Sequence, residues 1–138
     1  MERLKIVWIE DDSHIIYSVV RPLEKAGYEI VTIRDLEEAE RRINEVLGAA
    51  IVILDLIFPS CTGERYPGLK FMRILRRDHD IKAPVIVLSV VSNQQVLDEL
   101  KELGAMSVLR KPILPSHLAD AVASCKGRQL PGDEIAYS

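Results

Sequence analysis

Short, nearly continuous apolar runs alternate along this chain with segments of helical period, and this alternation limits the folds that it can adopt. The apolar runs occupy residues 6–9, 30–33, 49–54, 85–88 and, more weakly, 107–109. Strands that are buried on both faces of a parallel sheet have such runs, because helices cover both faces. A helical segment follows each run, as in βα units joined by right-handed crossovers. The sequence therefore predicts an α/β fold with a single doubly wound, five-stranded parallel sheet.

Glycines and capping residues predict where the helices begin and end. The first helix is expected to end before Gly27, and the second to run from the capping pair Asp35 and Glu38 to Leu47. The third is expected to begin after Gly68. The fourth would open with the pair Ser92 and Gln95 and end before Gly104, and the fifth would run from about Pro115 to Cys125. Pro22 falls inside the first helix, where its ring crowds the carbonyl of Ser18 at a cost of ~3 kcal/mol. Either that helix is kinked at Pro22 or its first turn starts late.

The composition is that of one ordinary globular domain. The chain has 138 residues, of which 48% are hydrophobic and 28% charged, and 18 basic residues against 21 acidic ones give a net charge of -3. This length suits a single domain with its own core, and the charge balance indicates no nucleic-acid surface. We expect residues 1–126 to form the domain. Residues 127–138 contain Pro131-Gly132 and no periodicity, so we expect a C-terminal tail or the start of a linker there.

No part of the sequence indicates a membrane or an oxidising compartment. The amino terminus lacks the apolar core of a signal peptide, and the uncharged apolar stretches are much shorter than a membrane span. Cys61 and Cys125 are the two cysteines, and because they have no metal-ligand spacing we expect reduced thiols. The expected location is cytoplasmic, without membrane contact.

A particular set of polar residues stands where the apolar runs end. Glu10 and Asp11 follow the first run, Asp55 follows the third, Ser89 the fourth and Lys111 the fifth. The carboxyl ends of parallel strands meet at one edge of the sheet, where open α/β sheets bind ligands. Carboxylates that can hold a divalent cation, a hydroxyl and an ammonium group together suit the handling of a phosphoryl group.

Five short motifs in this order resemble the receiver domain of two-component response regulators. They are Ile-Glu-Asp-Asp at 9–12, Ile-Leu-Asp-Leu-Ile-Phe-Pro at 53–59, Val-Ile-Val-Leu-Ser at 85–89, Gly-Ala at 104–105 and Leu-Arg-Lys-Pro at 109–112. The resemblance covers roughly residues 4–125. It implies a CheY-like, flavodoxin-like fold of five βα units with strand order 2-1-3-4-5.

The same resemblance implies a role for each polar residue. Asp55 would be the phosphoacceptor, which receives a phosphoryl group from the phosphohistidine of a histidine kinase or phosphotransfer protein. Glu10, Asp11 and Asp55 would hold Mg²⁺, which proteins bind through one or two carboxylates together with phosphate oxygens. Ser89 would donate a hydrogen bond to a phosphoryl oxygen, and Lys111 would pair with the carboxylate or the phosphate. The implied protein is a signalling receiver and not an enzyme: it promotes only its own phosphorylation and dephosphorylation, binds an unknown output partner and can form a homodimer.

Three apolar residues bear on how a receiver of this sequence would work. The position three residues before Lys111 is usually an aromatic switch that rotates, but here it is Val108, which cannot serve as one. Ile57 and Val91 occupy positions that lie along the approach of a hydrolytic water in receivers. Because neither side chain can orient water by a hydrogen bond, we expect slow self-dephosphorylation.

The loop after Pro59 is longer than usual. The usual spacing would place the helix-opening glycine at Gly63, but the helical pattern resumes only after Gly68, which leaves five extra residues (68 minus 63). Ser60 to Pro67 would therefore form either an enlarged flap beside the site or a tolerated surface insertion. The resemblance also implies a cis peptide bond before Pro112.

Other classes of protein place an acid after a strand as well. A haloacid-dehalogenase-like phosphatase needs a second aspartate two residues after the first, and a toprim-type nuclease needs an Asp-x-Asp pair, whereas this chain has Ile57 at that position. The alternative that stays open is a pseudo-receiver, which acts as a phosphorylation-independent protein interaction module. Such a module is expected to have lost an acid or the lysine, and this chain retains Glu10, Asp11, Asp55 and Lys111.

Overall fold

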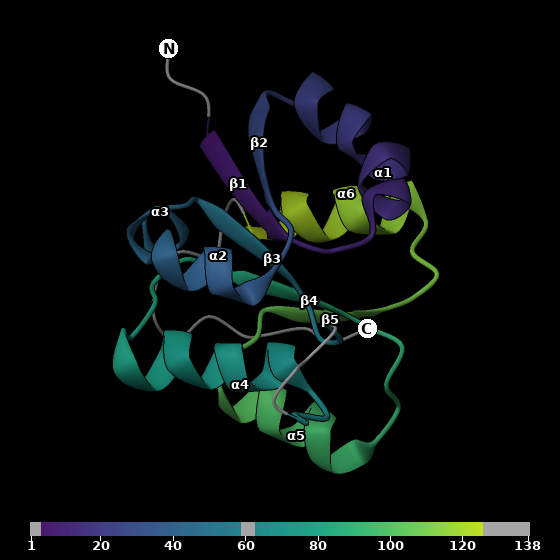
Figure 1. The fold of residues 1–138 in the computed structure, drawn as a ribbon. Helices are drawn as coiled ribbons and strands as arrows, with labels where there is room; N and C mark the ends of the chain where they lie inside the picture. The colour runs from purple at the N-terminus through teal and green to yellow at the C-terminus, as the bar shows by residue number, and fades with distance from the viewer. Residues whose placement is uncertain (1–3, 59–62, 126–138) are drawn as a thin grey trace.

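The computed structural model describes residues 4–58 and 63–125, and within them five parallel strands form one sheet (Figure 1). The strands are β1 (Leu4–Ile9), β2 (Tyr28–Ile33), β3 (Ile51–Asp55), β4 (Val85–Ser89) and β5 (Ser107–Arg110). Their order in the sheet is β2-β1-β3-β4-β5, and all neighbouring pairs are parallel. The doubly wound sheet predicted from the apolar runs, and its strand order, are thus confirmed.

Helices cover both faces of this sheet (Figure 1). On one face α1 (Ser13–Lys25) lies beside α6 (Pro115–Ser124). The other face is covered by α2 (Leu36–Arg41), α3 (Ile43–Leu47), α4 (Pro67–Arg73) and α5 (Gln94–Glu102), and α4 continues directly into the π-helix η1 (Ile74–Asp78).

The strands send alternate side chains into two apolar clusters, one on each face of the sheet. In β1, Val7 and Ile9 belong to the cluster that includes residues of α4 and α5, while Ile6 and Trp8 belong to the cluster that includes residues of α1 and α6. All four side chains are fully buried. Because both faces are covered, polar groups of the strands reach solvent mainly at the two edges where strands begin and end.

The first helix does not start late, which was one of the two ways in which it was predicted to accommodate Pro22. Asp12 caps it, since its carboxylate accepts a hydrogen bond from His14 N at 2.9 Å, and the helix begins at Ser13. It continues through Pro22 to Lys25, so the prediction of a late first turn is wrong. Gly27 follows with a φ of +99°, in the left-handed region that the predicted glycine stop requires.

Three other helix predictions are corrected in detail. Asn93, and not Ser92, caps α5, because its side-chain oxygen accepts hydrogen bonds from two backbone N–H groups at 2.9 and 3.3 Å. The third helix begins at Pro67, one residue before Gly68, since proline suits the first turn of a helix. The second predicted helix is divided at Arg42 into α2 and α3.

Some predictions concern parts of the chain that the structure does not describe. The domain boundary at residue 126, the tail or linker over 127–138, Cys61 and residues 60–62 of the long loop lie outside the described residues. Among the helices of the described part, none combines the length and the apolar character needed to cross a membrane. The peptide bond between Lys111 and Pro112 is cis, as the resemblance implies.

Candidate functional site

Three acidic side chains converge at the carboxyl edge of the sheet. Strands β1 and β3 are neighbours with Ile9 opposite Leu54, so Glu10, which follows β1, lies beside Asp55, the last residue of β3. Asp11 completes the group, and one oxygen from each of the three carboxylates lies within 4.8 Å of the other two. Glu10 is 0% and Asp55 3% exposed, while Asp11 is the most exposed of the three. The structure thus brings together the three acids that were predicted to hold Mg²⁺.

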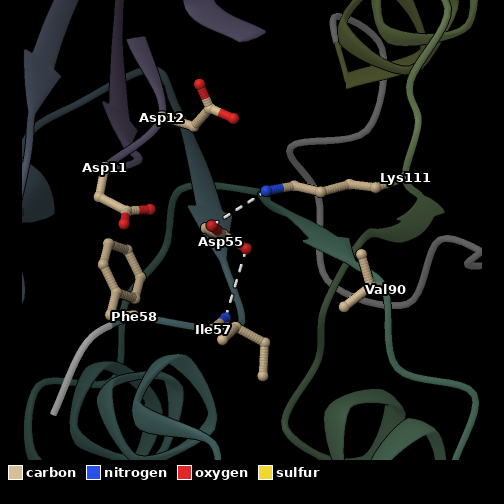
Figure 2. Close-up of a pocket in the computed structure, with 7 residues that line it drawn as sticks. All are labelled: Asp11, Asp12, Asp55, Ile57, Phe58, Val90 and Lys111. Carbon is tan, nitrogen blue, oxygen red and sulfur yellow. Dashed lines mark hydrogen bonds and ion pairs between the residues drawn. The ribbon is translucent and has the colours of Figure 1, made fainter. Parts of the chain in front are cut away.

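Lys111 adds a positive charge to this group. Its Nζ donates a hydrogen bond to Asp55 Oδ2 at 3.0 Å and lies 3.3 Å from both carboxylate oxygens of Glu10. In Figure 2 the side chain of Lys111 reaches across to Asp55. Burial lowers the pKa of Lys111, but the hydrogen bond and charge of Asp55, with the charge of Glu10, outweigh burial and raise the pKa above its usual value. Lys111 is therefore a permanent cation in the site.

The surroundings of Glu10 favour its protonated form. Burial, followed by the hydrogen bond and negative charge of Asp55, raises the pKa of Glu10 from 4.5 to about 8, and Lys111 offsets only part of this change. In addition, Oε1 of Glu10 is buried and has no hydrogen-bond partner within the described residues. A buried carboxylate oxygen with unused lone pairs, beside two more acids, is suited to bind a divalent cation.

An open pocket gives access to Asp55 (Figure 2). Its lining combines polar and apolar side chains, namely Asp11, Asp12, Asp55, Ile57, Phe58, Val90 and Lys111. Ile57 and Val90 are 36% and 60% exposed, which places them at the rim of the pocket. The approach to the Asp55 carboxylate is therefore bordered by two branched apolar side chains.

Val91 is not among the described residues that line the pocket. It is partly buried against the apolar cluster that includes residues of α4 and α5, and among the described residues it is Val90 that lines the pocket. Ile57 does line the pocket. The predicted role of Val91 in the approach of water to a phosphorylated Asp55 stays a prediction.

Ser89 is buried at the end of β4, with its hydroxyl turned toward its own loop. The hydroxyl oxygen accepts a hydrogen bond from Val91 N at 2.8 Å and lies 3.4 Å from Val91 O. The carbonyl of Ser89 accepts a hydrogen bond from Lys111 N at 2.9 Å, so the two residues are neighbours through the main chain. Within the described residues no hydrogen bond joins the Ser89 hydroxyl to Asp55. The serine is therefore near the site but engaged elsewhere.

Three residues line the pocket although the sequence predicted no role for them in the site. Asp12, Phe58 and Val90 line the pocket but were not among the predicted site residues. Asp12 caps α1, and only its position beside Glu10 and Asp11 in the sequence indicated that it could also line the pocket. Val108 is buried in the cluster that includes residues of α4 and α5.

The chain is similar to known proteins in sequence and in fold. A family model described as the response regulator receiver domain matches residues 6–123. The chain is 26% identical over 132 residues to the phosphate regulon transcriptional regulatory protein PhoB of Pseudomonas aeruginosa, an alignment that covers 95% of this chain and 55% of PhoB. It is 34% identical over 123 residues to the transcriptional regulatory protein PrrA of Mycobacterium leprae, with 88% and 48% covered. The structure of the chemotaxis protein CheY4 of Vibrio cholerae matches with a TM-score of 0.74 and 26% identity, over 90% of this chain and 99% of that one.

These findings agree with the geometry at the carboxyl edge of the sheet. The family match includes Glu10, Asp11, Asp55, Ser89 and Lys111. The chain spans about half the length of the curated relatives with which it aligns. With a family match that covers most of its length and a sheet of order 2-1-3-4-5, the chain belongs to the response regulator receiver domains, a family of signalling domains.

Proposed function

We propose that this receiver domain accepts a phosphoryl group on Asp55 from the phosphohistidine of a histidine kinase or phosphotransfer protein. A carboxylate oxygen of Asp55 forms a bond to phosphorus while the bond from phosphorus to the imidazole nitrogen breaks, and the imidazole leaves with that electron pair. The observation that carries the proposal is the position of the Asp55 carboxylate, in an open pocket and 3.0 Å from Lys111 Nζ. Phosphoryl transfer depends mainly on such positioning and on stabilisation of charge.

The neighbours of Asp55 have separate tasks in this proposal. Ile57 N donates a hydrogen bond to Asp55 Oδ1 at 3.3 Å, and together with Lys111 it fixes the direction of the carboxylate. During transfer Lys111 would stabilise the negative charge on the phosphoryl oxygens, because a fixed cation beside the reacting atoms costs no reorganisation. The open pocket leaves room for an imidazole group to approach Asp55.

Glu10, Asp11 and Asp55 would hold Mg²⁺ in this site. Three carboxylate oxygens within 4.8 Å of one another, among them the buried acid Glu10, whose Oε1 accepts no hydrogen bond within the described residues and lies 3.3 Å from Lys111 Nζ, fit a small divalent cation. Bound there, Mg²⁺ would supply charge neutralisation for the acids and the phosphoryl oxygens. The raised pKa of Glu10 means that without a cation this group retains a proton near neutral pH.

Phosphorylation would change what the domain binds by shifting a conformational equilibrium. Val108 is buried and aliphatic, so we assign the switch to Ser89 and its loop. Ser89 would exchange the hydrogen bond that its hydroxyl donates to Val91 O, at 3.4 Å, for one that it donates to a phosphoryl oxygen on Asp55. The backbone N–H of Val91 donates to the same hydroxyl oxygen at 2.8 Å, so its amide signal in a magnetic resonance spectrum should shift when the hydroxyl turns, and an unchanged signal after phosphorylation would contradict this switch.

The alternative is a pseudo-receiver that binds partners without phosphorylation. The intact arrangement of Asp55, Lys111 and two further acids favours the phosphorylated receiver. The output partner stays unknown, because transcriptional regulation is stated in the names of relatives about twice as long as this chain. A homodimer and a cytoplasmic location stay predictions.

Intact mass measurement tests the proposal. The wild-type chain and the variant Asp55→Asn are incubated with Mg²⁺ and acetyl phosphate, which donates a phosphoryl group and releases acetate. We expect one phosphoryl group on the wild type and none on Asp55→Asn. Asp120→Asn, which removes an exposed acid of α6, serves as the matched control and should behave as the wild type. A wild type without added mass, or an Asp55→Asn variant with it, would contradict the proposal.

A further inference from the structure

Gly68 lies so close to the end of β3 that no side chain fits at its position. It is the second residue of α4 and is buried. A Cβ atom on Gly68 would lie 2.2 Å from the carbonyl oxygen of Asp55 and 2.6 Å from Cα of Leu56, well under the 3.0 Å below which atoms must shift. The φ of Gly68 is outside the left-handed region. Close approach, and not backbone conformation, is therefore the reason for glycine here.

The main chain that Gly68 touches is held from two sides. Leu56 N donates a hydrogen bond to Leu88 O of β4 at 3.0 Å, and Leu56 O accepts one from Gly68 N at 2.9 Å. Helix α4 cannot move away from β3 without disturbing the core, because side chains of α4 such as Phe71 are buried in it. A side chain at position 68 would therefore push against the main chain of Asp55 and Leu56.

We propose that Gly68 is a positioning residue that sets the place of the Asp55 carboxylate, by packing α4 directly on the main chain of Asp55 and Leu56. The inference rests on the proposed role of Asp55 as phosphoacceptor. The carboxylate is aligned by Lys111 Nζ at 3.0 Å and Ile57 N at 3.3 Å, and both distances depend on where the strand ends. Gly68 acts through this main chain, and a displacement of about 1 Å at a reacting group can slow a reaction on the order of 100-fold.

Gly27 provides a matched control. Like Gly68 it is a glycine at the junction of a helix and a strand, but it precedes β2 and so lies at the opposite edge of the sheet from Asp55. A Cβ atom on Gly27 would meet nothing within 4 Å, while its φ of +99° makes any side chain strained. Gly27→Ala thus lowers stability without touching the site, which separates loss of stability from loss of positioning.

The test compares Gly68→Ala, Gly27→Ala and the wild type. Urea unfolding first identifies a temperature at which each protein is folded. At that temperature each is phosphorylated with acetyl phosphate and Mg²⁺, and its affinity for Mg²⁺ is measured by titration. We expect Gly68→Ala to be phosphorylated on the order of 100-fold more slowly, with weaker Mg²⁺ binding, while Gly27→Ala stays within about twofold of the wild type. A Gly68→Ala variant as fast as Gly27→Ala would overturn the inference.

A measurement on the wild type keeps the inference testable if Gly68→Ala does not fold. Because Gly68 N–H is bonded to the carbonyl of Leu56, its amide signal should shift on addition of Mg²⁺ together with that of Lys111, while the Gly27 signal stays in place. A Lys111 shift without a Gly68 shift would overturn the inference and leave the proposed function intact. A wild type that takes up neither Mg²⁺ nor a phosphoryl group would instead refute the proposed function, and this inference with it.

Discussion

At the scale of single residues, Glu10 connects the site to the pH dependence of stability. Its pKa is about 8 in the folded protein against 4.5 ordinarily, because of burial and then of Asp55. A carboxyl group with a raised folded pKa stabilises the protein fully below the unfolded pKa, and this contribution is lost as pH rises through the folded pKa. We therefore expect the free energy of unfolding of the metal-free protein to fall between about pH 5 and pH 9, by on the order of a few kcal/mol. Glu10→Gln should remove most of this loss.

Urea unfolding in the presence of a chelator, at pH values on either side of the folded pKa, measures this effect. Glu29→Gln, which changes an exposed glutamate of β2, is the control and should keep the wild-type pH dependence. Mg²⁺ at a hundred times its Kd should add about 2.7 kcal/mol to the wild type. The added stability should be larger above the folded pKa of Glu10, where the cation does not compete with a proton. An equal pH dependence in Glu10→Gln and the wild type would show that Glu10 titrates normally.

We expect Ile57 and Val90 to limit the access of water to a phosphorylated Asp55. Both line the pocket, both are exposed at its rim, and neither side chain can orient a water molecule. We expect the double variant Ile57→Asn with Val90→Glu to lose its phosphoryl group at least about tenfold faster than the wild type, because positioned polar groups assist the attack of water. The decay is followed by intact mass after removal of the phosphodonor, at one Mg²⁺ concentration.

Leu114→Asn is the control for this prediction. Leu114 is also an exposed apolar residue, 56% accessible, but it does not line the pocket. Its substitution should leave the lifetime of the phosphorylated protein unchanged. Equal lifetimes for the double variant and the wild type would mean that Ile57 and Val90 do not limit access.

At the scale of elements, two arginines join α4 and η1 to α5 and the segments beside it. Arg76 donates hydrogen bonds to the carbonyls of Leu103 at 2.8 Å and Ile81 at 2.7 Å. Arg73 makes two hydrogen bonds to Glu99, at 2.5 and 2.8 Å. Arg76→Met would leave two carbonyls of buried residues unpaired, so we expect a loss of roughly 2–3 kcal/mol in the free energy of unfolding. Arg73→Lys, which loses a half-exposed bidentate pair, should cost only about 0.5–1 kcal/mol.

The two losses should differ in their pH dependence. The hydrogen bond from Arg73 lowers the pKa of Glu99. A group with a lowered folded pKa stabilises the protein above its unfolded pKa, and this contribution is lost as pH falls through the folded pKa. The cost of Arg73→Lys should therefore vanish in acid, while that of Arg76→Met persists because carbonyls do not titrate. Urea unfolding at neutral and acidic pH tests this, and a cost for Arg73→Lys that persists in acid would contradict it.

At the scale of the whole molecule, the sequence predicted those features that depend on strand ends. The apolar runs identified the five strands, since burial on both faces leaves little room for polar residues. Parallel strands place their carboxyl ends at one edge, so residues that follow the runs had to meet there, and Glu10, Asp11, Asp55 and Lys111 do. The meeting of these distant residues was predictable because it follows from the parallel arrangement of the strands alone.

The features that the sequence could not predict depend on side-chain direction and close contact. Ser89 had the right position, but its hydrogen bond to Val91 depends on the conformation of a loop without periodicity. For the same reason Val90, and not Val91, lines the pocket. Gly68 was noted only as the glycine before a helix, because its contact with Asp55 joins residues of separate elements. Tertiary packing decides such contacts, and local sequence carries little trace of them.

The proposed function requires Asp55 to carry the phosphoryl group, and peptide mapping tests this directly. Borohydride reduces an aspartyl phosphate to homoserine, which tandem mass spectrometry locates in the peptides of the phosphorylated protein. The account predicts homoserine at position 55 and at no other aspartate, in an amount that matches the phosphoryl groups counted by intact mass. Homoserine at Asp11 or another acid, or phosphorylated protein that yields none at position 55, would contradict it.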